Sequence, residues 1–350
     1  MTERSGKIQT VCGLMDPSDL GITMTHEHLH MTFNVSYVPA EREADMEKTH
    51  IPLKLDTIGW IRQNPYSNRP NLLLDDEDET LIEELKFYKK NGGCSLVENT
   101  ILGIDRDIKK SKMYAEASGV NIIQGTGYYV GACHPPEMNT MSIEELTQFM
   151  VNDIEKGADG TDIKCGVIGE IGCSWPLQAN EKKVLQASAA AQAATGCPVI
   201  IHPGRNPIAP TDILRILGEA GGDTTKTVMS HLDRTIFDKE TLAEFAKQGS
   251  YLEFDLFGIE TSHYQMNHDV DMPSDAQRIQ YIKFLIEEGY NDKVVIAHDV
   301  HTKHRLMKYG GHGYSHILLN VVPKMLKRGI SQEQVDKILI ENPKKWLTFK

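Results

Sequence analysis

The feature that most constrains the fold is an alternation of short apolar segments with helices along most of the chain. We expect strands at residues 21–26, 94–98, 119–125, 163–169, 198–201, 226–230, 251–255 and 293–297. The helices expected after them span 80–90, 105–118, 142–156, 180–195, 211–220, 238–248, 275–289 and 315–328. Short apolar strands between helices are typical of parallel strands buried on both faces. Eight such units predict an α/β fold, the (β/α)8 TIM barrel.

An open doubly wound sheet is the alternative, but the first strand is not followed by the Gly-rich phosphate turn of that fold. A length of 350 residues allows two domains; because a barrel of this size can be one, we expect a single domain over 1–350. Residues 31–79 are irregular and end in an acidic run. We interpret them as an excursion after strand one that covers the barrel mouth. Residues 8–14 favour a small lead-in hairpin.

The composition of the chain narrows the classes of molecule that it could bind. The chain is 40% hydrophobic and 25% charged, with a net charge of −12. Such a charge disfavours nucleic acid or an anionic membrane as a partner and leaves a small-molecule substrate. The oligomeric state is open, and a homodimer is compatible. The six scattered cysteines favour reduced thiols in the cytoplasm, and neither a signal peptide nor a membrane-spanning apolar run is expected.

Ligand-type side chains stand at the ends of five expected strands. In a barrel the chemistry lies at the carboxyl ends of the strands. His26 and His28 end strand one and share a face, because side chains on a strand alternate. The later strands contribute Glu170, His202, His231 and Asp299. Imidazole and carboxylate donors without thiolate are typical of a divalent metal site. His298 should point away from Asp299 and be structural.

The number of these ligands favours two divalent ions, with zinc as the expected metal, because four imidazoles and two carboxylates would crowd one ion. We expect Glu170 to bridge. His26, His28 and Asp299 would hold one ion, and His202 and His231 the other. Two ions roughly 3.5–4 Å apart can activate a water and stabilise a developing oxyanion. Asp299 is also placed to accept the proton of the attacking water.

Five motifs carry a resemblance to a known family. They are Thr-His-Glu-His-Leu, Gly-Glu-Ile-Gly-Cys-Ser-Trp-Pro, Ile-His-Pro-Gly-Arg, Met-Ser-His-Leu-Asp-Arg-Thr and Ala-His-Asp-Val-His-Thr-Lys-x-Arg-Leu. The chain resembles the phosphotriesterase family of the amidohydrolase superfamily from about residue 7 to its end. The resemblance implies a binuclear zinc-type barrel hydrolase and carries the ligand roles onto the same six residues. The founding members bridge their metals with a carbamylated lysine, whereas the matching region here offers Glu170, and Lys164 lies near the start of that strand.

A second departure concerns the related lactonases, which carry an Arg after the strand-seven Asp. This chain has Asp255-Leu256-Phe257-Gly258 there, which weakens both a phosphotriesterase and a lactonase assignment. Tyr129 matches the active-site tyrosine of the lactonases. It would donate to a carbonyl oxygen, or else be ordinary packing.

Within the family the chain resembles the phosphotriesterase-related branch, which is similar to amidases of N-acyltaurines. This resemblance implies hydrolysis of N-acetyltaurine and related N-acyltaurines to taurine and a carboxylate. A phosphotriester or lactone hydrolase on the same site is the alternative, and a metal-dependent binding protein is a third. A sulfonate needs fixed cationic donors. The candidates are Arg205, Arg234, Lys303 and Arg305, each of which has an alternative interpretation as a solvated loop charge.

Overall fold

Eight parallel strands form the sheet at the centre of the computed structural model, which describes residues 3–261 and 264–350. Each strand pairs in parallel with the next along the chain. Their bounds are β3 (Thr23–Glu27), β4 (Ser95–Glu98), β5 (Asn121–Thr126), β6 (Val167–Gly172), β7 (Val199–His202), β8 (Thr227–Met229), β9 (Tyr251–Phe254) and β10 (Val294–Ile296). This sequential order is that of a barrel.

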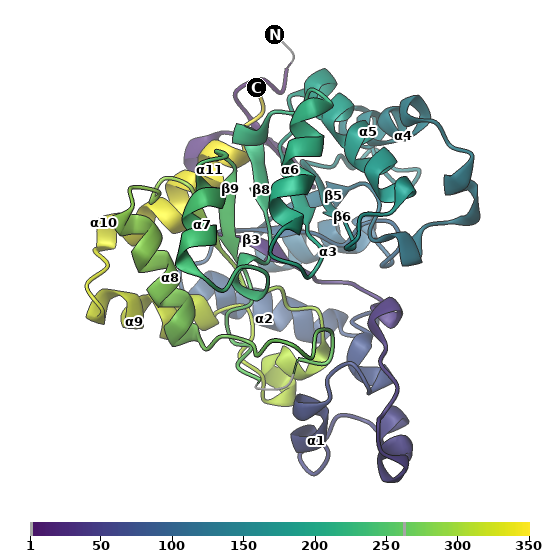
Figure 1. Ribbon diagram of the computed structural model, residues 1–350, viewed down its shortest axis with the longest axis vertical. Coiled ribbons are helices and arrows are strands. Elements are labelled where there is room, and N and C mark those ends of the chain that lie inside the picture. Colours follow the sequence, from purple (N-terminus) through teal and green to yellow (C-terminus); the bar gives the residue numbers. More distant parts are fainter. Residues whose placement is uncertain (1–2, 262–263) are drawn as a thin grey trace.

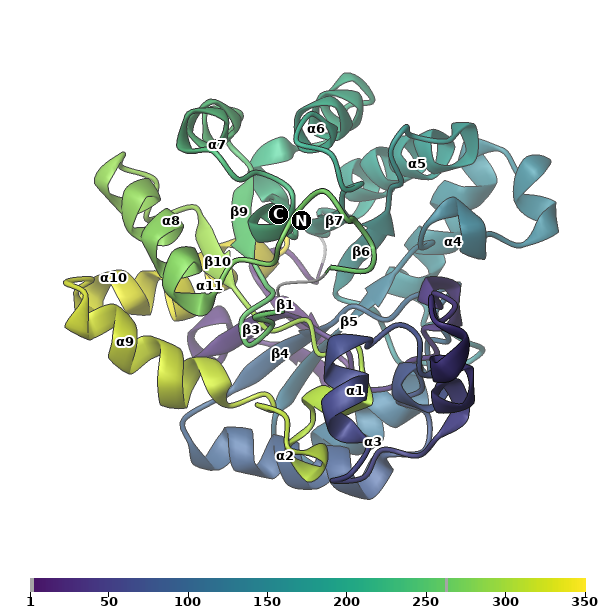
Figure 2. The same cartoon turned by 60° about the horizontal axis from the view of Figure 1, so that its bottom comes forward.

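Contacts between the first and last strands bring the sheet round on itself. Thr25 Oγ1 donates to the Ile296 carbonyl at 3.4 Å, and the Asp299 N–H donates to the His26 carbonyl at 3.0 Å. Figure 2 shows the helices as an outer ring around the strands. They are α2 (Asp78–Lys90), α3 (Ile108–Ser118), α4 (Ile143–Glu155), α5 (Ala179–Thr195), α6 (Ala209–Glu219), α7 (Lys239–Ala246) and α8 (Asp275–Glu287). The predicted TIM barrel is confirmed.

Local sequence signals set the ends of several helices. Ser142 and Glu145 form a reciprocal capping box at the start of α4, as Ser274 and Gln277 do at α8. The helix α5 ends at Gly196, whose φ of 72° is a left-handed conformation that glycine adopts without steric cost. These signals fix the residues at which α4 and α8 begin and α5 ends.

The segments outside the repeating units lie at opposite ends of the barrel. The excursion after β3 contains η2 (Asn34–Ser36), η3 (Glu43–His50), α1 (Ile58–Gln63) and η4 (Arg69–Leu72). In Figure 1 the excursion projects at the bottom, whereas the two termini lie together at the top. The eighth helix of the outer ring, expected over 315–328, is formed by η11 (Ile317–Val321) and α9 (Val322–Lys327) (Figure 2). After it come α10 (Gln332–Asp336), η12 (Lys337–Glu341) and α11 (Asn342–Leu347). The lead-in hairpin is present as β1 (Ile8–Thr10) and β2 (Gly13–Met15).

An apolar layer, which we call the floor, fills the end of the barrel near the termini. Six strands each contribute one branched aliphatic side chain, and the hairpin, α11 and the β2–β3 connection cover them. The floor consists of Ile8, Leu20, Val97, Ile123, Val167, Ile200, Val228, Tyr251, Val295, Trp346 and Leu347, all buried. Its Trp346 indole Nε1 donates to the Val199 carbonyl at 3.1 Å. The barrel interior at this level is therefore a packed core.

The sequence-based position of the fourth barrel strand was wrong by about four residues. The Cys165 N–H donates to the Asp153 carbonyl at the end of α4, so the chain is still turning there and the ladder begins at Val167. Glu170 consequently lies inside β6 and not after it. All six cysteines are free thiols. Among the residues that the structure describes, no helix has both the length and the apolar character needed to span a bilayer.

Candidate active site at the barrel mouth

The six ligand-type residues predicted from the sequence converge at the carboxyl ends of the strands. His26 and Glu170 lie on β3 and β6, and His202 is the last residue of β7. His28, His231 and Asp299 follow β3, β8 and β10. All six are buried. We call them the mouth cluster: His26, His28, Glu170, His202, His231 and Asp299.

Glu170 occupies the centre of the mouth cluster. Its Oε1 lies 3.3 Å from His28 Nε2. Its Oε2 lies 2.9 Å from His202 Nδ1, 3.4 Å from His231 Nε2 and 3.5 Å from His26 Nε2. One carboxylate thus faces all four imidazoles, with its two oxygens turned to different histidines.

The donor atoms fall into groups compact enough to surround an ion. The potential ligand atoms of His26, His28 and Asp299 lie within 4.8 Å of one another, and so do those of Glu170, His202 and His231. These two groups coincide with the division expected from the sequence. A third group of the same size, His26, His231 and Asp255, overlaps both.

One contact and one buried atom without a partner indicate that the mouth cluster suits a cation. His231 Nε2 and His202 Nδ1 face each other at 2.9 Å, both directed toward Glu170. His26 Nε2 is buried without a hydrogen-bond partner among the described residues. Buried polar atoms are normally paired. These imidazole nitrogens converge beside the Glu170 carboxylate. A divalent metal satisfies such an arrangement.

The electrostatics point the same way. Burial alone would lower the pKa of His28, but Asp299 and Glu170 raise it to about 9. Burial would likewise raise the pKa of Glu170, yet His26 and His202 hold that pKa well below its usual range. The cluster therefore keeps its buried carboxylates ionised, and it favours positive charge at its centre.

Residues behind the mouth cluster orient its imidazoles. Asp255, directly after β9, places Oδ1 2.8 Å from His231 Nδ1 and accepts the His231 backbone N–H at 3.0 Å. Thr100 Oγ1 lies 2.9 Å from His28 Nδ1. Because the Nδ1 atoms of both rings are engaged, their Nε2 atoms face Glu170. Sequence reasoning did not assign Asp255 to the site, although the strand-end rule that found its neighbours applies to β9 as well.

Asp299 is held in a conformation that non-glycine residues seldom adopt, with φ of 52°. Its Oδ1 lies 3.2 Å from His28 Nε2 and its Oδ2 lies 3.1 Å from His301 Nδ1. The other His301 nitrogen, Nε2, is 3.0 Å from the Tyr66 hydroxyl, which the excursion supplies. No sequence signal in the irregular excursion identified Tyr66. His298 faces away from the cluster, as strand alternation predicts, with Nδ1 2.6 Å from Glu27.

The expected cationic residues separate into two pairs. Arg205 and Arg234 line the inner cavity beside the mouth cluster. Arg234 is buried and Arg205 is partly buried. Arg205 Nε donates to the Tyr264 hydroxyl at 2.7 Å, and Arg234 donates toward His202 Nε2 and the Pro203 carbonyl at 3.2 and 3.3 Å. Within the described part of the chain neither guanidinium has a carboxylate partner. Two guanidiniums without carboxylate counterions, side by side in one cavity, are able to bind an anion.

The other two cations are engaged elsewhere. Lys303 Nζ lies 3.3 Å from Glu77 and does not line the cavity beside the mouth cluster. The Arg305 guanidinium is buried against backbone carbonyls, those of His298, Asp299 and Phe257. Its donors are engaged by the protein, although the side chain also lines the outer cavity. Contact of Arg305 with the substrate anion stays a prediction. The alternative interpretation of Arg305, as a solvated loop charge, is wrong because the residue is buried.

Tyr129 stands at the edge of the mouth cluster. Its hydroxyl lies 3.3 Å from His202 Nδ1, and the ring lines the inner cavity. Burial, with Glu170 nearby, raises the pKa of Tyr129 well above its usual value. The hydroxyl therefore stays protonated and can donate a hydrogen bond to an oxygen in the cavity.

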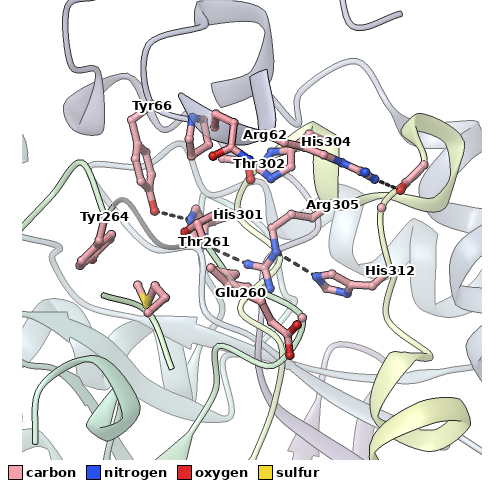
Figure 3. Close-up of a pocket in the computed structure, with 17 residues that line it drawn as sticks. Arg62, Tyr66, Glu260, Thr261, Tyr264, His301, Thr302, His304, Arg305 and His312 are labelled. Atoms are coloured by element: carbon pink, nitrogen blue, oxygen red, sulfur yellow. Dashed lines mark hydrogen bonds between the residues drawn. The ribbon is translucent and has the colours of Figure 1, made fainter. Parts of the chain in front are cut away.

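Two cavities meet at the barrel mouth. The inner one, beside the mouth cluster, has about 20 Å³, the space of a single water. The outer one has about 460 Å³ and is drawn in Figure 3. Both are lined by Tyr66, Tyr264, Met272 and His301, which separate them. The hydroxyl of Tyr66 points to the His301 ring in Figure 3. A small molecule that reaches the mouth cluster must displace this partition or extend across it.

Comparisons with known proteins match this architecture. The model of the Phosphotriesterase family matches residues 6–347. A protein named N-acetyltaurine hydrolase from Salmo salar is 60% identical over 350 residues, which cover 100% of both chains. The crystal structure of a resiniferatoxin-binding protein from Rhodobacter sphaeroides superimposes with a TM-score of 0.94 at 32% identity, over 98% of this chain and 95% of that one.

A phosphotriesterase homology protein from Escherichia coli, crystallised with phosphate in its active site, gives a TM-score of 0.77 at 26% identity, over 95% of this chain and 100% of that one. The family match and the full-length relative agree with the resemblance that the five sequence motifs carry. This protein belongs to the phosphotriesterase family and is a hydrolytic enzyme.

Proposed function

We propose that this enzyme hydrolyses the amide bond of a small N-acylated sulfonate, N-acetyltaurine above all and related N-acyltaurines, to taurine and a carboxylate. The observation that carries the proposal is the pair of guanidiniums without carboxylate partners, Arg205 and Arg234, in the cavity that the mouth cluster lines. A taurine sulfonate is a compact anion that two such groups can neutralise. The relative from Salmo salar is named for this reaction.

We further propose that the mouth cluster binds two divalent ions, zinc foremost. His26, His28 and Asp299 would hold one, His202 and His231 the other, and Glu170 would bridge them. The division is supported by the two compact donor groups and by the separate oxygens of Glu170. When bound, such ions polarise a carbonyl oxygen and lower the pKa of water, to about 7 in zinc enzymes.

The side chains of the chain itself have distinct tasks in this reaction. Arg205 and Arg234 bind the sulfonate and so place the amide beside the mouth cluster. The Tyr129 hydroxyl donates to the carbonyl oxygen as it becomes an oxyanion. Asp299 accepts the proton of the attacking water and returns it to the departing amine, which is a poor leaving group unless protonated.

Side-by-side assays of the metal-loaded protein test the substrate. We expect the highest kcat/KM on N-acetyltaurine and a much lower value on N-ethylacetamide, which lacks the sulfonate. Greater activity on a lactone or a phosphotriester would replace the proposal with that activity. Losing a hydrogen bond to a charged group costs about 1.5–3 kcal/mol, so Arg205→Ala should raise KM for N-acetyltaurine roughly 10- to 100-fold.

Arg215→Ala is the matched control for Arg205→Ala. Arg215 is exposed on α6 and pairs with Asp212 and Glu219. We expect it to leave KM unchanged. An equal KM for wild type and Arg205→Ala would contradict the assignment of the sulfonate to this pair.

The glutamate bridge has a test of its own. A carbamylated lysine needs carbon dioxide, whereas Glu170 needs none. Reconstitution of metal-free protein should therefore proceed equally with and without bicarbonate. Lys164 precedes β6 and lines a cavity with Glu3 and Arg4, away from the mouth cluster. A bicarbonate requirement would refute the bridging role of Glu170.

A further inference from the structure

The turn that carries Asp299 needs support from its neighbours. Asp299 has φ of 52°, a left-handed backbone conformation in which an L-residue persists only when its surroundings hold it. Its own N–H donates to the His26 carbonyl at 3.0 Å. This bond fixes one peptide of the turn but leaves the flanking peptides, those of His298 and Val300, to be held by other groups.

Glu27 holds both flanking peptides on one side. It lies between His26 and His28, so its side chain points to the opposite face of β3. Its Oε1 accepts the His298 backbone N–H at 2.9 Å and faces His298 Nδ1 at 2.6 Å. Its Oε2 accepts the Val300 N–H at 3.1 Å. A single fully buried carboxylate thus binds the residues before and after Asp299.

Arg305 holds the same turn through its carbonyls. Its two terminal nitrogens donate to the carbonyls of Asp299 and His298, and one of them also reaches the Phe257 carbonyl at 3.3 Å. Its Nε donates to His312 Nε2 at 3.1 Å, the contact drawn in Figure 3. The planar guanidinium fits two adjacent carbonyls at once, a geometry that a lysine ammonium does not reproduce.

We propose that Glu27 and Arg305 are positioning residues that aim the Asp299 carboxylate at the mouth cluster. The carboxylate takes the N–H groups of the turn and the guanidinium takes its carbonyls, so opposite buried charges fix it from two sides. Neither side chain touches the Asp299 carboxylate. The inference rests on the proposed role of Asp299 as ligand and proton acceptor. The proposal explains why the residue between His26 and His28 is an acid, and why Arg305 is buried beside the site.

Arg305→Lys and the isosteric Glu27→Gln test the proposal. Each should lower kcat on N-acetyltaurine at least 10-fold with KM changed less than 2-fold, because substrate contacts stay in place. Each should also weaken zinc binding at least 10-fold in competition with a chromophoric chelator, a readout independent of turnover. If Arg305→Lys fails to fold, Glu27→Gln provides the same test, since it preserves size and removes one acceptor.

Arg106→Lys is the control for losing a buried guanidinium. Arg106, just before α3, pairs with Asp153 on α4 at 2.8 Å and with Asp159 just after α4 at 2.6 Å. None of these residues belongs to the turn that carries Asp299. The substitution should reduce thermal stability and leave kcat and zinc affinity unchanged. A rise in KM confined to sulfonate substrates in Arg305→Lys would make it a substrate ligand and overturn the proposal. Unchanged kcat and zinc affinity in both variants would overturn it too. If wild type does not cleave the amide, the proposed function fails, while the zinc measurement still decides the positioning role.

Discussion

The two ends of the barrel interior are built from opposite kinds of residue. The floor is aliphatic and aromatic, and every member is buried against others of its kind. The mouth cluster is equally buried but consists of imidazoles and carboxylates whose charges depend on one another. Burial of apolar surface stabilises a fold, whereas buried ionisable groups without a full set of partners cost free energy. The same strands therefore supply stability at one end and chemistry at the other.

The largest expected effect separates catalysis from stability at the mouth. Asp299→Asn keeps the shape of the side chain and removes its basicity. Since general acid–base catalysis contributes about 10²–10⁴-fold, kcat on N-acetyltaurine should fall by that factor in protein that is still folded at the assay temperature. Turnover of an activated aryl acetate, whose leaving group needs no proton, should fall far less. Equal losses on both substrates would leave Asp299 as a metal ligand alone.

A substitution in the floor should do the opposite: it should lower stability and leave kcat unchanged. Trp346→Ala removes the largest fully buried side chain and its hydrogen bond to the Val199 carbonyl. Removal of a buried Trp costs about 3–5 kcal/mol, which should appear as a lower urea midpoint. Well below its transition temperature, the kcat of the folded variant should equal that of wild type. A large loss of kcat in the folded variant would show that the two ends are not independent.

The smallest effect concerns a buried acid on the mouth side outside the cluster. Glu84 on α2 accepts the Met307 N–H at 2.6 Å, and burial raises its pKa to about 7. A carboxyl whose folded pKa exceeds its unfolded value of 4.5 stabilises the fold below pH 4.5, and this contribution is lost as pH rises through 7. Glu84→Gln removes the dependence.

Urea unfolding at several pH values measures this effect. The stability of Glu84→Gln relative to wild type should increase between pH 5 and pH 8. One pKa unit corresponds to about 1.4 kcal/mol, so a gain of order 1–3 kcal/mol is expected. Lys344→Gln, whose partner Glu341 is half-exposed, serves as a surface control with a flat profile. A flat profile for Glu84→Gln as well would contradict the raised pKa.

The same contrast explains which parts could be predicted from the sequence. Barrel strands and the mouth cluster follow from local signals, because apolar periodicity marks a strand and its carboxyl end marks the mouth. Glu170 was expected just after its strand, but it lies within β6. The strand starts about four residues later than the apolar run, because the Cys165 N–H donates to α4 and not to a neighbouring strand. Apolarity alone does not reveal such competition for a backbone group.

Contacts between distant segments account for what was missed. Tyr66 contacts His301, although more than 200 residues of chain separate them. Nothing in the sequence of the excursion indicates this contact. Arg305 was expected to bind the substrate because it follows a ligand-bearing strand end, and the sequence did not indicate that its donors reach the carbonyls of His298 and Asp299. The local sequence shows which charged residues lie near a site. Which groups those residues contact depends on how distant loops pack together.

Metal content tests the central claim that the mouth cluster is a two-metal hydrolytic centre. His202 and Ile200 lie two residues apart on β7, one in the mouth cluster and the other in the floor. Elemental analysis of purified, zinc-saturated and dialysed protein should give two metals per chain for wild type and for Ile200→Ala, but one for His202→Ala, with most of the activity lost only in His202→Ala. Two metals per chain in His202→Ala, or only one or none in wild type, would contradict the account.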